Sequence, residues 1–262
     1  MSPEEFRRYG HHIVDLIADY RRDLADRPVM SRSVPGALRA QLPATPPETP
    51  EGMDAVLADV VNLIEPALTH WQHPRFFGWF PSNGALSSVL GDLLSTGFGV
   101  LGLSWQSSPA LTELEEVVCD WLRQLLGLSS AWHGVIQDTA STSTLVALIC
   151  AREKSSGMSL ATTGMQSSEA PLVVYVSSQS HSSVEKAALL AGFGRAHLRQ
   201  VAVDEAHAMR VDALEAAIAE DLRNGLRPCA IVATSGTTGC TAFDPIAAIA
   251  EVARRRGVWL HV

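Results

Sequence analysis

The chain has 262 residues, 47% of them hydrophobic and 18% charged, which excludes a disordered protein because this composition supplies a large buried core. A formal net charge of −8 at pH 7, without a basic stripe, argues against nucleic acid or an anionic membrane as a partner and favours a small molecule. The four cysteines lie far apart and no uncharged apolar run is long enough for a bilayer, so we expect a cytoplasmic protein with reduced thiols and no membrane segment.

The first predicted element is a helix that opens with a capping box formed by Ser2 and Glu5. Its apolar residues recur at helical spacing: Phe6, Ile13, Leu16, Ile17, Tyr20 and Leu24. Residues 27–52 follow, and their six prolines predict an extended arm rather than a compact unit. The helix therefore docks either on a partner subunit or on its own domain, and the sequence leaves both open.

A second helix, predicted over residues 53–70, precedes the most aromatic stretch of the chain. Five aromatic residues stand there between helix breakers: Trp71, Phe76, Phe77, Trp79 and Phe80. In a loop they must pack against something flat and apolar, such as an aromatic ligand, although a small satellite core under the loop is the more common arrangement. His70 and His73 lack a third ligand at a useful spacing, so we expect no metal site.

Further helices are predicted over residues 86–94, 109–126 and 142–154. The second of them has an apolar face that is expected to point inward: Leu111, Leu114, Val118, Trp121 and Leu125. The third follows a turn of small residues at 134–141, and a helix N-terminus after such a turn can serve as an anion site, although most such turns are only capped helices. The turn lacks the lysine of a P-loop and the glycines of a dinucleotide fingerprint, which disfavours a nucleotide-binding domain.

Strands and helices alternate from residue 134 onward, which predicts a mostly parallel sheet with helices on both faces. Strands are expected over residues 172–177, 201–203, 229–233 and 258–262. Helices are expected from the loop at 178–183 through Leu190, and over residues 211–223. Residues 155–170 form an insertion rich in Ser, Thr and Gly, which we expect to be a mobile surface loop.

The last stretch, residues 229–262, contains a strand, a hydroxyl-rich loop, a helix and a further strand. Asp244 is the predicted N-cap of this helix and Gly257 its end. Parallel strands bring their carboxyl ends to one edge of the sheet, where open α/β folds bind ligands. His181 and Thr234 are both expected at that edge, although a histidine in such a loop is more often only solvated.

Six motifs stand in one order along the chain: HPRFFGWFPS at 73–82, SWQSSPALTELE at 104–115, GVIQDTAS at 134–141, SSQSHSSVEKA at 177–187, VATSGTT at 232–238 and WLHV at 259–262. Together they closely resemble the pyridoxal-phosphate-dependent aromatic-L-amino-acid decarboxylases, the group II decarboxylases. The resemblance implies an α/β fold of the aspartate aminotransferase type, fold type I, and a homodimer with its sites at the subunit interface. It also implies an N-terminal helical segment and arm at residues 1–80, which embraces the partner, and a large cofactor-binding domain at residues 81–262.

The same resemblance assigns cofactor roles to four residues. Ala140 and Ser141 are expected to hold the phosphate of pyridoxal 5'-phosphate, at the helix N-terminus already noted. His181 is expected to stack over the pyridine ring as the catalytic residue of this chain, and Thr234 to lie beside the cofactor.

Six residues are expected to form the substrate site: Trp71, Trp79, Phe80, Pro81, Leu103 and Ser82. The hydroxyl of Ser82 is expected to reach the polar end of the substrate. Relatives usually have Tyr at the position of Trp79, Thr at that of Ser82 and often an aromatic residue at that of Leu103. Asp138 and Thr139 also replace smaller residues of the phosphate turn. These changes keep the hydroxyl and the aromatic character, so the resemblance implies the reaction and leaves the substrate open.

The implied activity is release of CO2 from an aromatic L-amino acid, namely tryptophan, DOPA, tyrosine or phenylalanine, to leave the amine. The alternatives are an aldehyde-forming oxidative decarboxylase of the same family and a non-catalytic assembly subunit. In relatives the Asp that pairs with the cofactor directly follows the residues at 261–262, and the cofactor lysine comes later. Lys154 and Lys186 lack the local sequence of that lysine. We therefore expect the chain to need a C-terminal half and to be inactive alone.

Overall fold

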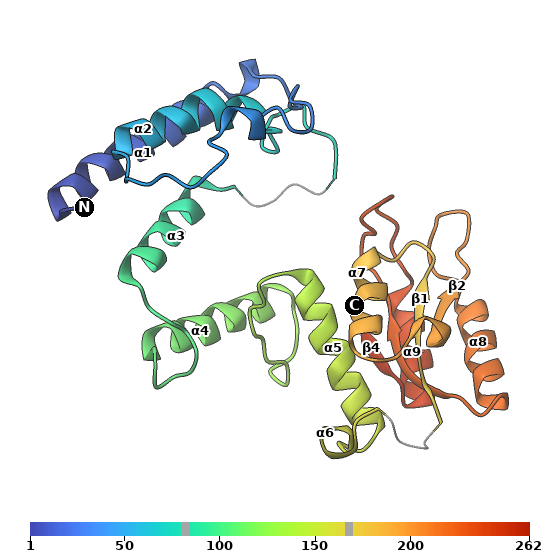
Figure 1. Ribbon diagram of the computed structural model, residues 1–262. Helices are drawn as coiled ribbons and strands as arrows, with labels where there is room; N and C mark the ends of the chain where they lie inside the picture. The colour runs from blue at the N-terminus through green and yellow to red at the C-terminus, as the bar shows by residue number, and fades with distance from the viewer. Residues whose placement is uncertain (80–83, 166–169) are drawn as a thin grey trace. The chain divides into compact units, whose positions relative to one another are not determined.

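The computed structural model describes residues 1–79, 84–165 and 170–262, and Figure 1 shows their path. The chain divides into two units, Met1–Gly99 and Val100–Val262, and each is described here by itself. The sequence predicted a functional boundary after residue 80. The division after Gly99 reflects only how compactly each part folds, so the functional boundary after residue 80 stays a prediction.

The first unit is helical. Helix α1 spans Pro3–Arg22, and its predicted capping box is confirmed, because the Ser2 hydroxyl accepts from the Glu5 N–H while the Glu5 carboxylate accepts from the Ser2 N–H. Two short 3₁₀ turns follow at Leu24–Asp26 (η1) and Arg39–Gln41 (η2). Next come the α-helix α2 (Met53–Asp59), the short π-helix η3 (Val60–Ile64) and the 3₁₀ turn η4 (Glu65–Ala67). The unit ends with helix α3 (Leu86–Phe98).

Two predicted helices of this unit have different bounds. The helix expected over residues 53–70 is α-helical only to Asp59 and ends at Ala67. Pro66 has no N–H to donate, so the regular α-helical ladder cannot run through it. The helix expected to stop at residue 94 extends to Phe98, where Gly99 adopts the left-handed conformation with φ of 63° and closes it.

The second unit is built on a parallel sheet with the strand order β2-β1-β3-β4. The strands are Leu172–Ser177 (β1), Leu198–Val201 (β2), Arg227–Val232 (β3) and Trp259–His261 (β4). All three neighbouring pairs are parallel, which confirms the predicted sheet. Strand β2 begins three residues before its predicted start because Leu198 pairs with Val174 of β1.

Helices cover both faces of this sheet (Figure 1). The helices of this unit are α4 (Pro109–Leu125), α5 (Ala140–Ser155), the short α6 (Leu160–Thr163), α7 (Ser182–Leu190), α8 (Val211–Arg223) and α9 (Ile246–Arg256), with the 3₁₀ turn η5 at Arg195–His197. Those that cover the sheet are α5 and α7 on one face and α8 and α9 on the other. On one face, Val174 and Val176 pack with residues of α5 and α7. On the other, Val173, Tyr175 and Ile231 pack with residues of α8 and α9. Strand β1 is buried on both faces, as its unbroken apolar run predicts.

The expected inward face of α4 is a wrong prediction. None of the residues of α4 is buried, and Leu114, Trp121 and Leu125 are all exposed. The sheet faces are already covered by α5, α7, α8 and α9, so this unit offers α4 no apolar surface on which to bury its stripe.

Asp244 is also not the predicted N-cap. Helix α9 begins at Ile246 with Pro245 in the cap position, and the cap has no side-chain hydrogen bond. The buried Asp244 carboxylate instead accepts from the N–H of Thr234 at 2.8 Å and from the N–H of Met209 at 2.7 Å. One carboxylate thus accepts from backbone N–H groups of two separate loops. Burying either N–H group without an acceptor would be costly.

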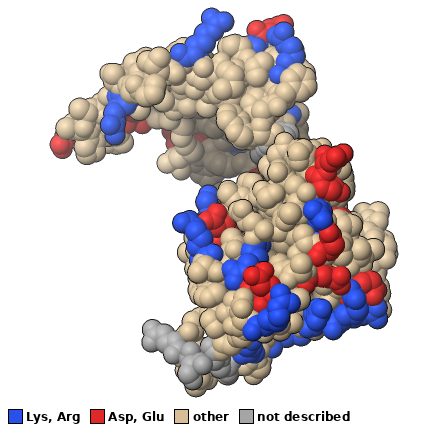
Figure 2. Space-filling view, turned by 90° about the vertical axis from the view of Figure 1, so that its right-hand side faces the viewer, with Lys and Arg blue, Asp and Glu red and all other residues tan. Residues whose placement is uncertain are grey.

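Acidic and basic side chains are interspersed on the face shown in Figure 2, and they form no single basic stripe there. Within the described part of the chain, no helix combines the length and apolar character needed to cross a membrane.

Candidate active site

A pocket of about 420 Å³ lies at the carboxyl edge of the sheet. Its walls come from the N-terminal turns of two helices and from the ends of two strands: Ala140, Ser143 and Thr144 of α5, His181, Ser183 and Val184 at α7, Val232 to Ser235 and Thr238 after β3, and His261 and Val262 at β4. The structure therefore brings three predicted residues, Ala140, His181 and Thr234, to one cavity. Its volume lies within the range of small-molecule sites.

The first turn of α5 forms one end of this pocket. Thr139 caps the helix, with its hydroxyl accepting from the Thr142 N–H at 3.2 Å. Helix geometry leaves the N–H groups of Ala140 and Ser141 without intrahelical acceptors, which creates a site for an anion. Ala140 lines the pocket, and Ser141 lies in the same turn although it is not a lining residue.

An acidic side chain stands immediately before this turn. A hydrogen bond from the Thr142 side chain holds the pKa of the Asp138 carboxyl below its usual value. The carboxylate therefore stays ionised at the positive end of the α5 dipole, where a negative charge is stabilised. The sequence analysis singled out Asp138 only as a departure from relatives.

His181 is the N-cap of α7, a role that the sequence analysis did not predict. Its Nδ1 accepts from the Ser183 N–H at 3.2 Å and lies 2.8 Å from the Ser183 hydroxyl. Because a backbone N–H only donates, the neutral ring carries its hydrogen on Nε2. The cap fixes an exposed imidazole at the pocket wall with a defined tautomer.

Thr234 is held where β3 ends. Its N–H donates to the Asp244 carboxylate at 2.8 Å, and the following loop is tied by the buried Thr237 hydroxyl, which accepts from the Ala242 N–H at 2.9 Å. Gly236 has a φ of 88°, a conformation that disfavours any residue with a Cβ. The loop beside the pocket is therefore tied by hydrogen bonds to Asp244 and Thr237 despite its small residues.

His261 also lines the pocket, and its imidazole is a titratable group to which the sequence analysis assigned no role. Its Nε2 lies 3.4 Å from the Thr144 hydroxyl of α5, and burial lowers the pKa of its imidazole. The neutral ring thus links the end of β4 to the first turns of α5. Its position near the end of the last predicted strand was the available signal, because every strand of a parallel sheet ends at the same edge.

The predicted substrate residues fall into three groups. Trp71 and Trp79 lie in the first unit and stack with ring centroids 5.5 Å apart, and Phe76 lies 5.2 Å from Trp71. Leu103 belongs to the second unit, is exposed and does not line the pocket. Phe80, Pro81 and Ser82 lie outside the described residues.

The stacked cluster of Trp71, Phe76 and Trp79 is not a core under a loop. Trp79 keeps 69% of its surface exposed, and Phe77 beside it is exposed as well. The rings bury one another only in part, which leaves flat apolar faces free for a ligand or for another surface.

Three comparisons place the chain among known proteins. The pyridoxal-dependent decarboxylase conserved domain matches residues 35–262. A phenylacetaldehyde synthase of Arabidopsis thaliana and tyrosine decarboxylase 4 of Petroselinum crispum are each 43% identical over 270 residues, covering 100% of this chain and 54% and 52% of those proteins. The crystal structure of Catharanthus roseus tryptophan decarboxylase in complex with L-tryptophan aligns with a TM-score of 0.93 at 37% identity, covering 100% of this chain and 57% of that one.

These matches confirm the predicted fold type I, since the aligned structure superposes over the whole of this chain. The chain spans about half the length of the curated relatives that it matches.

Proposed function

The chain belongs to the pyridoxal-dependent decarboxylase family, and on this premise we propose that the protein containing it converts an aromatic L-amino acid to the amine and CO2 with pyridoxal 5'-phosphate. The observation that carries the proposal is the pocket of about 420 Å³ in which the α5 N-terminus, His181 and Thr234 converge. We propose in addition that the protein is a homodimer and that a C-terminal half supplies the Asp and Lys expected from the resemblance.

The residues present fit a phosphorylated pyridine. A phosphate needs an anion cradle, and the first turn of the 16-residue helix α5 offers backbone N–H groups beside the hydroxyls of Ser143 and Thr144. A flat ring needs a flat partner, and the imidazole of His181 stands at the same pocket with its orientation fixed. When bound, the cofactor supplies an electron sink for the electron pair left behind as the carboxylate departs as CO2.

The chain's own residues orient and shield the reacting groups. Ala140 and Ser141 would hold the phosphate of the cofactor through their N–H groups. His181 would hold the ring through its flat imidazole, and its Nε2–H would be the donor available to a carboxylate because Nδ1 is used by the α7 cap. Thr234 would offer its hydroxyl to the cofactor, and Asp244 fixes the Thr234 backbone.

We assign the substrate class to the aromatic cluster of the first unit. Trp71 and Trp79 present flat faces that suit an aromatic side chain, and stacked or edge-on aromatic pairs add about 0.5–1.5 kcal/mol beyond area burial. Phe80, Pro81, Ser82 and Leu103 are proposed to complete this site. Which aromatic amino acid is preferred depends on their joint shape.

The test is amine formation by the complete protein with tryptophan, DOPA, tyrosine and phenylalanine as separate substrates. Amine and CO2 in equal amounts from at least one of them is the expected result. Turnover of glutamate or histidine alone would contradict the aromatic assignment, and absence of any turnover would favour a non-catalytic assembly subunit.

A second candidate is the oxidative reaction that forms an aldehyde. It is favoured by the phenylacetaldehyde synthase of Arabidopsis thaliana, which is as similar to this chain, at 43% identity, as the tyrosine decarboxylase is. That reaction consumes O2 and water and releases the aldehyde, CO2, ammonia and hydrogen peroxide. A hydrogen peroxide assay on the same samples separates the two activities.

A further inference from the structure

The turn that carries the aromatic cluster is attached to the C-terminal end of α1 by two buried histidines. His70 and His73 each keep 3% of their surface exposed, in a unit that buries few apolar side chains. Burying a polar ring stabilises nothing unless its nitrogens are hydrogen-bonded. Their contacts therefore decide what the two imidazoles do.

His70 is fixed from two directions. Its Nδ1 is hydrogen-bonded to the Tyr20 hydroxyl of α1 at 2.8 Å, with the two ring centroids 5.6 Å apart. The backbone N–H of His70 donates to the Val29 carbonyl at 3.0 Å. Burial, with the nearby Arg27, lowers the pKa of the His70 imidazole, so the ring is neutral where it meets Tyr20.

His73 is fixed in one tautomer. Its Nδ1 accepts from the Arg75 N–H at 2.9 Å, and its Nε2 lies 3.2 Å from the Ala25 carbonyl, just after α1. A backbone N–H only donates and a carbonyl only accepts, so Nδ1 is the acceptor and Nε2 carries the hydrogen. The ring bridges the α1 end and its own turn in a single orientation.

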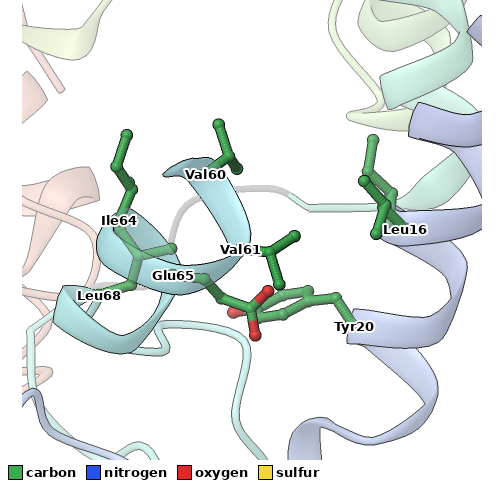
Figure 3. Close-up of a pocket in the computed structure, with 8 residues that line it drawn as sticks. Leu16, Tyr20, Val60, Val61, Ile64, Glu65 and Leu68 are labelled. Carbon is green, nitrogen blue, oxygen red and sulfur yellow. The ribbon is translucent and has the colours of Figure 1, made fainter. Parts of the chain in front are cut away.

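Tyr20 is itself held in place. The Arg27 guanidinium lies 5.1 Å from the centre of the Tyr20 ring and pairs with the Glu65 carboxylate. Figure 3 shows Glu65 beside the Tyr20 ring, and both belong to the lining of an apolar groove together with Leu16, Val61 and their neighbours. A half-buried ion pair and a cation–π contact thus restrict the ring that anchors His70.

The anchored turn leads directly to the aromatic rings. Trp71 follows His70 in the chain, and the Phe76 N–H donates to the His73 carbonyl at 2.9 Å. The His73 N–H in turn donates to the His70 carbonyl at 3.0 Å. Trp71 is therefore joined to His70 by a peptide bond, and Phe76 is joined to His73 by a backbone hydrogen bond.

We propose that Tyr20, His70 and His73 are positioning residues that set substrate preference by fixing the stack of Trp71, Phe76 and Trp79. This inference rests on the proposed function, which assigns Trp71 and Trp79 to the substrate site. The rings are too exposed to be held by core packing, so directional hydrogen bonds to α1 determine where their flat faces lie. A loss of these bonds shifts the faces and weakens recognition of an aromatic side chain without touching the reacting atoms.

The test compares Tyr20→Phe with Tyr9→Phe in the complete protein. Both tyrosines lie on α1, and both hydroxyls make one hydrogen bond between elements, since the Tyr9 hydroxyl donates to the Asp54 carboxylate at 3.0 Å. Only Tyr20 touches the anchored turn. Kinetics with an aromatic amino acid are combined with circular dichroism, in which stacked indoles such as Trp71 and Trp79 give an exciton couplet that Trp79→Phe identifies by abolishing it.

Tyr20→Phe is expected to weaken the couplet and to raise KM about 5- to 10-fold with kcat within about 2-fold of wild type, the scale of one lost hydrogen bond. Tyr9→Phe is expected to change neither. An unchanged couplet in Tyr20→Phe overturns the positioning role, and a weakened couplet with unchanged KM overturns its link to substrate preference. If the wild type acts on no aromatic amino acid, the proposed function fails, and the couplet alone still decides whether these residues position the rings.

Discussion

The two units differ in what their interiors contain. In the second unit all six residues of β1 are buried, and apolar residues from helices pack on both faces of the sheet. In the first unit, Leu24 and Leu57 are the buried apolar residues among those described, and His70 and His73 are buried with them. One interior is held by apolar packing, and the other relies on directional polar contacts.

This difference separates two sources of stability. The second unit buries its own core, so its fold follows from alternating apolar patterns and is stabilised by about 25 cal/mol for each Å² of apolar surface removed from water. The first unit leaves large apolar residues of α3 exposed, among them Leu90, Leu94 and Phe98. Hydrogen bonds and ion pairs therefore contribute more to its fold. We predict that the partner subunit covers the exposed residues of α3.

Core truncation tests the contrast most strongly. Ile249→Ala removes a fully buried side chain between α9 and the sheet, and we expect a loss of about 2–5 kcal/mol in the free energy of unfolding. Ile13→Ala on the exposed stripe of α1 is the matched control, with an expected loss below about 1 kcal/mol. Urea-induced unfolding measures both. Equal losses would break the comparison, since they would show that the α1 stripe is covered in the assembled protein.

Removing the ring of His181 tests whether the second unit carries the chemistry separately from its stability. His181→Asn keeps a side-chain cap for α7 but no ring, and kcat/KM is expected to fall by an amount on the order of 2–4 kcal/mol. His207→Asn is the control, because His207 is exposed with a φ of 62°, which Asn tolerates. Normal turnover by His181→Asn would reject its catalytic assignment, and matching losses of activity and stability would indicate a structural role.

The sheet of the second unit and the helices that cover it were predictable because their signals are local, whereas the exposed face of α4 and the cap of α9 were not. Strand β1 and helix α8 have the predicted bounds to the residue, since an unbroken apolar run and a helical period suffice to define them. The first unit was less predictable after residue 59. A short π-helix and a 3₁₀ turn replace the expected helix there. They contact Arg27 and Tyr20, which lie more than 30 residues earlier in the sequence, so a local pattern does not reveal these contacts.

The site divides in the same way. His181 and Thr234 follow predicted strands, so parallel topology alone placed both at one edge. The contact between His261 and Thr144 depends on the register of β4 against β3, which no local pattern specifies. Trp79 stacks on Trp71 with a positive φ of 49°, a backbone conformation that a tryptophan in the sequence does not announce.

A buried polar contact of the second unit sharpens the comparison at an intermediate scale. Asp244→Asn turns one acceptor toward Thr234 or Met209 into a donor, which leaves a buried N–H unpaired. We expect a loss of about 1–3 kcal/mol in the free energy of unfolding. Asp212→Asn, at an exposed ion pair of α8, is the control, with an expected loss below about 1 kcal/mol. A neutral result for Asp244→Asn would mean that the second unit, unlike the first, gains nothing from its polar contacts.

The smallest expected effect is a pH dependence that both units share. Burial lowers the pKa of His261 in the second unit and of His70 in the first below the ordinary value of 6.5. As the pH falls through that value, the unfolded chain binds protons that the folded chain does not, so the free energy of unfolding decreases until the folded pKa values are reached.

We expect this decrease as the pH falls through about 6.5, measured by urea unfolding at a series of pH values. His261→Gln removes the share of the second unit and keeps an amide near Thr144, while the share of His70 remains. An unchanged pH slope in His261→Gln would contradict a neutral buried imidazole at the end of β4. A slope that vanishes entirely would place all of the proton linkage in the second unit and none in the histidine that anchors the aromatic turn.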